Sequence, residues 1–239
     1  MSECLKKRLN EIHLKAVEFH EYCDREMFGF SFLIKLLDNN NSLYQEATNI
    51  TNNKKDKVKF EEMCEKEHQI SIKNWYSNFQ GVPQEIAIIM AQDENINWEY
   101  NQRKAYRVML NILFIFLFFG STIVLYLFTK EFYSIIFAVP IVIDCFNLIL
   151  DNNASIKRCE FIREKIGTIY NELKTKGKNY DLTMVNVESN CIQLKIYENR
   201  KESISVPDIV YKLLKSKLQK QSDDYIKSIK QDIKNYLKR

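Results

Sequence analysis

The stretch that decides the fold is residues 109–128, "MLNILFIFLFFGSTIVLYLF", which contains no charged residue. A helix of this length crosses the hydrocarbon core of a bilayer, which is about 30 Å thick. Residues 132–150, "FYSIIFAVPIVIDCFNLIL", form a second apolar run in which Asp144 is the one charge. Because only residues 129–131 separate the two runs, the sequence predicts a transmembrane helical hairpin with two antiparallel spans.

The rest of the chain has the composition of long helices. It contains only 5 glycines and 3 prolines in 239 residues, and no stretch alternates apolar and polar residues for long. Both features argue against a β-rich fold. We therefore predict an all-α fold, in which long juxtamembrane helices extend the hairpin into a helical cytosolic domain.

Several helix positions follow from local patterns. Residues 4–26 predict an amphipathic helix, whose apolar stripe consists of Leu5, Leu9, Ile12, Ala16, Phe19 and Cys23. Pro83 suits a helix start, and Pro207 suits the start of a last, lysine-rich helix. A further helix is predicted over residues 181–199. The inner side of the helix that leaves the second span is predicted to hold Ile156, Ile162, Ile166 and Ile169.

We expect three regions along the chain. Residues 1–94 form an N-terminal cytosolic helical region, and residues 95–175 hold the juxtamembrane helices and the hairpin. Residues 176–239 form a C-terminal basic helical region. Its lysines fit either solvated helix faces or a position against acidic lipid headgroups.

Basic residues near the spans predict the orientation. Arg103, Lys104 and Arg107 precede the first span, whereas the turn between the spans has only Lys130. Basic residues that follow the second span are Lys157, Arg158, Arg163 and Lys165. The positive-inside rule therefore places both flanks and both termini in the cytosol. The first 25 residues are charged throughout and do not resemble a signal peptide.

A polar face is predicted inside the membrane. Pro140, Asp144 and Asn147 follow a spacing of i, i+4 and i+7, which puts them on one side of a helix. Asn111 of the first span lies near the depth of Asn147, and Pro140 is expected to kink the second span. Three roles for Asp144 stay open: it faces a pore or cavity, it bonds to a neighbouring helix, or it is reached by water with little role.

No enzyme motif is present in the sequence. We find no pairing of a nucleophile with a base, no glycine-rich phosphate loop and no cysteine–histidine spacing typical of a metal site. The basic C-terminal region lacks a recognised nucleic-acid-binding motif. These patterns predict a protein that is not an enzyme, with no catalytic residue, metal or cofactor and no nucleic acid polymer as a partner.

Four separated stretches resemble the SMODS-associated four-transmembrane effectors of bacteria. They are "AVEFHEYCDREMFGFSF" (16–32), "NWYSNFQGVP" (74–83), "AQDENINWEYNQRKAY" (91–106) and "CIQLKIYENRKESISVPDIVYKLLK" (191–215). They occur in the order expected for the family and run the length of the chain. The positions that carry the resemblance are Phe28, Gly29, Trp75, Tyr76, Pro83, Asn95, Trp98, Arg103, Tyr106, Tyr197, Arg200, Pro207, Asp208 and Tyr211.

The resemblance implies a pore-forming effector of a CBASS-like anti-phage system. Such an effector would form a homo-oligomer in the inner membrane and permeabilise it when a cyclic oligonucleotide messenger is made. A membrane-tethered sensor or scaffold without pore activity is the alternative. The family's name implies four spans, whereas this sequence shows two, so a first hairpin before residue 16 is expected to be missing.

Overall fold

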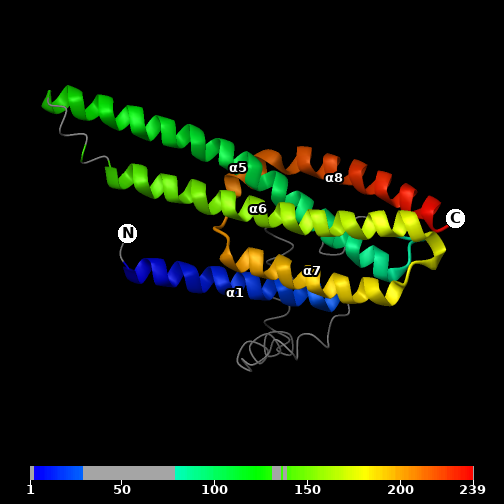
Figure 1. Ribbon diagram of the computed structural model, residues 1–239. Coiled ribbons are helices and arrows are strands. Elements are labelled where there is room, and N and C mark those ends of the chain that lie inside the picture. The colour runs from blue at the N-terminus through cyan, green and yellow to red at the C-terminus, as the bar shows by residue number, and fades with distance from the viewer. Residues whose placement is uncertain (1–2, 29–78, 131–135, 137–138, 239) are drawn as a thin grey trace.

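The computed structural model describes residues 3–28, 79–130, 136 and 139–238. These residues form five long α-helices, one short 3-10 helix and no strand, which confirms the predicted all-α fold. Helices α5 and α6 lie antiparallel and project together from one end of a helical bundle (Figure 1). Helix α7 lies between α1 and α6, and α8 lies along α5.

Helix α5 (Gln84–Thr129) is a single helix of 46 residues that joins the bundle to the projecting end. Pro83 precedes it with an extended backbone, within one residue of the predicted start. The helix ends at Lys130, whose φ of 57° is left-handed and whose N–H donates to the Tyr126 carbonyl oxygen at 2.7 Å. A left-handed residue is a common helix end because it turns the chain away from the axis.

Helix α6 (Val139–Lys176) returns from the projecting end to the bundle. Pro140 therefore lies in the first turn, where the backbone N–H has no partner within the helix and proline is well tolerated. The sequence had predicted that Pro140 kinks the middle of a span, whereas the structure places this residue at the start of the described helix. Residues 131–135 and 137–138 of the predicted turn and second span lie outside the described residues, so the two-span hairpin stays a prediction.

The remaining helices begin and end close to the predicted positions. Asp181 accepts a hydrogen bond from the Thr183 N–H at 2.9 Å and so caps α7 (Leu182–Glu202). Pro207 immediately precedes α8 (Asp208–Tyr236). Helix α1 (Glu3–Phe28) covers the predicted N-terminal helix, and the 3-10 helix η3 (Gly177–Asn179) links α6 to α7.

Isoleucines dominate the core, which lies at the end of the bundle away from the projecting helices. The four predicted inward isoleucines of α6 are all buried. Three of them, Ile162, Ile166 and Ile169, pack with residues of α5, α7 and α8, including Ile86, Ile89, Ile196, Ile226 and Ile233.

The apolar stripe predicted on α1 is wrong at the three positions whose side chains the structure describes, while Leu5, Phe19 and Cys23 lie outside the described side chains. Leu9, Ile12 and Ala16 are exposed. The buried residues that the structure describes on this helix are instead Val17, Glu21 and Asp24. Two acids can be buried here because α7 supplies polar partners for both of them.

Candidate functional site

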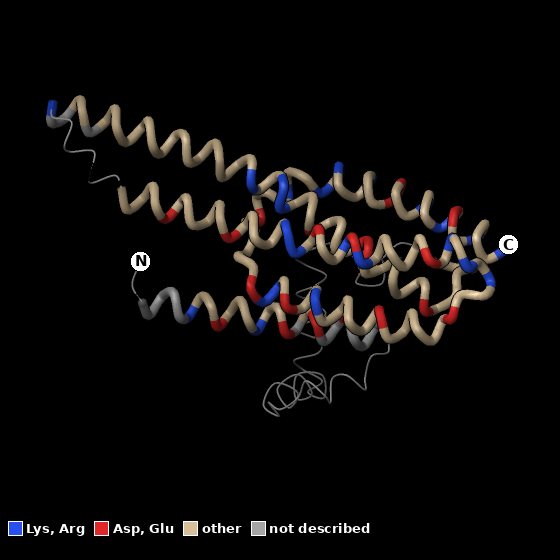
Figure 2. Tube along the Cα trace, in the orientation of Figure 1, with Lys and Arg blue, Asp and Glu red and all other residues tan. Residues whose placement is uncertain are grey.

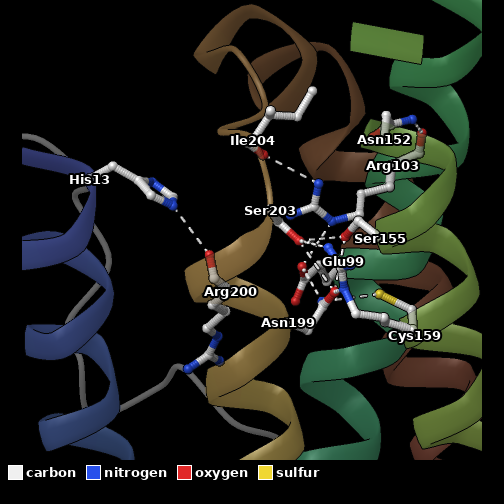
Figure 3. Close-up of polar contacts among 11 residues, drawn as sticks. His13, Glu99, Arg103, Asn152, Ser155, Cys159, Asn199, Arg200, Ser203 and Ile204 are labelled. Atoms are coloured by element: carbon white, nitrogen blue, oxygen red, sulfur yellow. Dashed lines mark hydrogen bonds and ion pairs between the residues drawn. The ribbon is translucent and has the colours of Figure 1, made fainter. Parts of the chain in front are cut away.

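A layer of polar side chains crosses the bundle just below the projecting helices. It consists of residues from α5, α6 and α7 together with Ser203, which directly follows α7, and we call it the polar layer (Figure 3). Its members are Glu99, Arg103, Asn152, Ser155, Arg158, Asn199 and Ser203.

Arg103 ties three parts of the chain together. Its Nε donates to Glu99 Oε1 at 2.8 Å within α5, and its Nη1 donates to the Ile204 carbonyl oxygen at 3.3 Å, after the end of α7. Asn152 of α6 donates to the Arg103 carbonyl oxygen at 3.0 Å. Arg103 and Asn152 are both buried. An unpaired polar group costs most in such an environment, so these bonds fix where α6 and the end of α7 meet α5.

Asn199 of α7 is the hub of the polar layer. Its side-chain amide donates to Glu99 Oε1 at 2.9 Å, and its Oδ1 accepts from Arg158 Nε at 3.0 Å. The hydroxyls of Ser155 and Ser203 donate to the same oxygen at 3.1 and 3.2 Å. Four hydrogen bonds thus converge on the buried Asn199 amide. A shift of any of these helices at this level would break several hydrogen bonds together.

The chemistry of the layer is structural. The nearby Cys159 thiol is buried, and this burial, reinforced by Glu99, raises its pKa to about 12. The thiol is therefore protonated and unreactive at neutral pH. Within the described ranges no group of His, Cys, Asp and Glu is placed to hold a metal ion. The layer is suited to fixing helix positions and not to activating a nucleophile.

A second polar cluster holds α1 against the bundle. Arg200 Nη1 lies 2.6 Å from Asp24 Oδ2 and 3.9 Å from Glu21 Oε2. Gln193 Nε2 donates to Glu21 Oε2 at 2.9 Å and accepts through Oε1 from Gln92 of α5 at 3.1 Å. The cluster therefore connects α1 to α5 through α7. We call these five residues the α1 latch.

A histidine contact lies next to the α1 latch. His13 Nε2 is 3.2 Å from the Arg200 carbonyl oxygen, and its Nδ1 is 3.0 Å from the Ser205 hydroxyl (Figure 3). Further along α1, burial is the main cause that lowers the pKa of His20 to about 4, with the Arg200 charge second. His20 is therefore neutral when α1 is docked at physiological pH.

Two adjacent acids of α5 bind α8 at the other side of the bundle. Asp93 Oδ2 accepts from the Tyr225 hydroxyl at 2.9 Å, and Glu94 Oε1 accepts from the Ser222 hydroxyl at 3.1 Å. Burial raises the pKa of Asp93 to about 6, although Tyr225, Tyr170 and the Arg163 charge act in the opposite direction. Hydrogen bonds thus fix α8 as well as α1 to the helix that continues into the apolar segment.

The predicted membrane polar face lies on the surface of the single chain. Pro140, Asp144 and Asn147 of α6 are exposed, and so is Asn111 of α5. Cys145 is instead the buried residue at this level, with its thiol 4.0 Å from the Leu110 carbonyl oxygen. The four polar positions are therefore free to face lipid, water or a second subunit.

The positions that carried the family resemblance fall into two groups. Gly29, Trp75 and Tyr76 lie outside the described residues, and Phe28 is the last residue of α1. The others are described by the structure, and among them Arg103 belongs to the polar layer and Arg200 to the α1 latch. Pro83 precedes α5, Asn95, Trp98, Arg103 and Tyr106 lie on α5, Tyr197 and Arg200 lie on α7, and Pro207, Asp208 and Tyr211 surround the start of α8.

Aromatic residues from this second group meet where α8 begins. The rings of Trp98 and Tyr211 have centroids 6.2 Å apart. Tyr106 is buried and packs with Leu110 and Val210. These contacts join the start of α8 to α5 directly below the apolar segment.

Comparison with known protein families decides the identity of the chain. The family model described as the SMODS-associating 4TM effector domain matches residues 4–229. The chain belongs to this family. None of the curated proteins or solved structures compared with this effector gave a match. The chain is thus a SMODS-associated transmembrane effector, and this family is not a known enzyme family.

The structure of the effector agrees with a membrane protein. In the described part of the chain, one helical segment, Gln84–Val124 within α5, is long and apolar enough to cross a bilayer. Only 6% of its most apolar window is buried inside the structure. A core helix of a soluble protein would be mostly buried, so the exposed surface of this segment fits contact with lipid.

No sequence pattern predicted the hub of the polar layer. Asp and Glu residues at helix-surface spacings are typical of solvated faces, and nothing in the sequence singles out Glu99, Glu21 or Asp24. The structure instead buries Glu21 and Asp24 and brings Glu99 into the polar layer. No local pattern distinguishes Asn199 from other asparagines. Arg200 was found only through the family resemblance, whereas Arg103 was also identified as one of the basic residues before the first span.

Proposed function

We propose that this effector oligomerises in the bacterial inner membrane and permeabilises it in response to a cyclic oligonucleotide messenger, as part of a CBASS-like anti-phage system. The observation that carries the proposal is the continuity of α5. One unbroken helix runs from the buried isoleucine core, through the polar layer, into a segment whose large apolar side chains are exposed. Phe116 in this segment is 72% exposed.

The proposed topology has both termini in the cytosol and more than one membrane crossing. Lys104 and Arg107 lie where α5 leaves the bundle, and Lys157 lies where α6 enters it. Figure 2 shows basic residues at the level where the projecting helices meet the bundle, while the projecting part of α5 is free of charge until its end. This distribution supports a cytosolic bundle under the positive-inside rule.

The polar layer and the α1 latch support a coupling between the bundle and the membrane segment. A messenger that binds the cytosolic bundle changes a membrane pore only if it binds two arrangements of the helices unequally. Buried hydrogen-bond networks that break as a unit suit such discrete arrangements. In this proposal the polar layer transmits a change in the bundle to α5 and α6.

Asp144 is the residue that we propose lines the permeation path. It is exposed on α6 on the same face as Pro140 and Asn147. A ring of carboxylates from several subunits favours the passage of cations. The competing role is a hydrogen bond from protonated Asp144 to a neighbouring subunit, which would stabilise the oligomer without lining a path.

Membrane depolarisation in cells that express the full chain tests the proposal. We expect a potential-sensitive dye to report depolarisation after the messenger-producing system is activated. Asp144→Asn should reduce this depolarisation, whereas Asp232→Asn, which removes the same charge from an exposed site near the far end of α8, should not.

Two outcomes would contradict different parts of the proposal. If the intact chain is inserted in the membrane and causes no depolarisation, permeabilisation is wrong and the tethered sensor or scaffold is favoured. If depolarisation occurs and Asp144→Asn leaves it unchanged, Asp144 does not line the path. Cross-linked oligomers of the Asp144→Asn variant would then be compared with those of the parent.

A further inference from the structure

The start of α8 carries a surface that packing among the described residues does not explain. Ile209 and Leu213 are 60% and 73% exposed, although both are large and apolar. Leu213 is thus as exposed as Phe116 in the middle of the membrane segment. Lys212 and Lys217 are exposed beside them. We call these four residues the α8 entry surface.

Contacts on the inner side of α8 give the depth of this surface relative to the membrane. Val210, adjacent to Ile209, is buried against Tyr106 and Leu110 of α5. Met109, close to the start of the uncharged stretch of α5 that follows Arg107, packs against the same cluster. The α8 entry surface therefore lies level with the point where α5 passes from the bundle into the apolar segment.

The direction of α8 limits the surface to its first turns. From Val210 the helix runs along α5 away from the projecting end, and its last turns pack on the isoleucine core through Ile233 (Figure 1). Ile209 and Leu213 are one helical turn apart on the outer side. Only this end of α8 can meet the bilayer, and it is the end that exposes apolar residues.

We propose that the α8 entry surface docks on the cytosolic face of the bilayer, in a membrane that contains acidic lipids. Ile209 and Leu213 lie at the boundary between headgroups and acyl chains, and Lys212 and Lys217 face the phosphates. The apolar part lies level with the start of the exposed apolar surface of α5, and the lysines complement acidic headgroups. The proposal is independent of whether the chain conducts ions.

Tryptophan quenching in proteoliposomes of the full chain tests the docking. Leu213→Trp places a fluorophore on the surface, and Val187→Trp provides a matched control. Val187 is an exposed apolar residue in the first turns of α7, at the end of the bundle away from the membrane segment. The vesicles contain phosphatidylcholine brominated near the headgroup end of its acyl chains. Emission from the native Trp75 and Trp98 is subtracted by using the parent protein.

We expect brominated lipid to cause a loss of the Leu213→Trp emission and no loss of the Val187→Trp emission. Ile209→Trp should behave like Leu213→Trp, which covers the case in which one variant does not fold. Equal quenching of all three variants would overturn the proposal. So would quenching of Leu213→Trp that disappears as the protein is concentrated in the vesicle, because a second copy would then cover the surface.

The lysines are tested separately with acidic lipid. Adding phosphatidylglycerol to the vesicles should increase the quenching of Leu213→Trp, and Lys212→Gln combined with Lys217→Gln should remove this increase. An increase that persists without both lysines would show that they do not face the headgroups. The contact of Ile209 and Leu213 with lipid would then be tested only by the quenching measured in vesicles without acidic lipid.

Discussion

Replacing Arg200 with methionine should release α1 from the bundle. The Arg200 guanidinium is the buried cation of the α1 latch, with a side chain 9% exposed, and it lies 2.6 Å from Asp24, which is 1% exposed. Glu21 lies 3.9 Å from the same nitrogen. Methionine fills much of the arginine volume, so the main loss is the charge that faces two buried carboxylates.

The size of the effect follows from the burial of these groups. Removing one partner of a buried ion pair costs about 3–5 kcal/mol, because the other charge stays in a poorly solvating environment. Since 1.4 kcal/mol corresponds to a factor of ten, the opening of α1 should become roughly 10²- to 4 × 10³-fold more frequent. The loss falls on the docking of α1, because the isoleucine core does not include these residues.

Amide hydrogen exchange measured by mass spectrometry reports this opening directly. In Arg200→Met, peptides from α1 should exchange faster by the stated factor, while peptides from α8 keep their protection. Lys201→Met is the matched control, because Lys201 is the exposed neighbour on the same helix. The reasoning is refuted if α1 exchanges equally in the two variants, or if Arg200→Met raises exchange equally in every helix.

Further predictions concern pH and helix stability. Because the pKa of His20 is lowered from 6.5 to about 4, the released α1 binds a proton that the docked α1 does not. Docking should therefore weaken as the pH falls from 6.5 to 4, and His20→Gln should remove this dependence of α1 exchange. The pKa of Asp93 is raised from 3.8 to about 6, so the folded chain holds this proton more tightly than the unfolded chain and Asp93 favours folding at low pH. Stability gained below pH 3.8 is lost as the pH rises through 6, and Asp93→Asn should flatten that slope in thermal unfolding. Gly167→Ala in α6 should raise the free energy of unfolding by about 1 kcal/mol, because the added methyl group meets nothing within 4 Å; no gain would contradict this.

Much of the fold could be predicted from the sequence because the decisive signals are local. The uncharged stretch after Arg107 predicted the apolar segment of α5, and Pro83 and Pro207 marked two helix starts to within one residue. The scarcity of glycine predicted long helices. The predicted division at residue 94 falls inside α5, because no local signal marks where a continuous helix changes its surroundings.

The polar contacts could not be predicted because they depend on which helices become neighbours. Asn199 joins residues from three helices that are distant in sequence, so its role exists only after the bundle forms. The predicted burial of Leu9 and Ile12 on α1 is wrong for a related reason. Periodicity marks Leu9 and Ile12 as one face, but the partners that α7 offers are polar and select Glu21 and Asp24 for burial.

We propose above that a signal received by the cytosolic bundle makes the effector permeabilise a membrane. Ion flux from proteoliposomes that contain only the purified full chain tests this proposal. Flux should rise when a panel of cyclic oligonucleotides includes the cognate messenger, and Arg200→Met should change this response. Permeabilisation by the effector is wrong if correctly inserted protein releases no ions with any member of the panel, at any protein density.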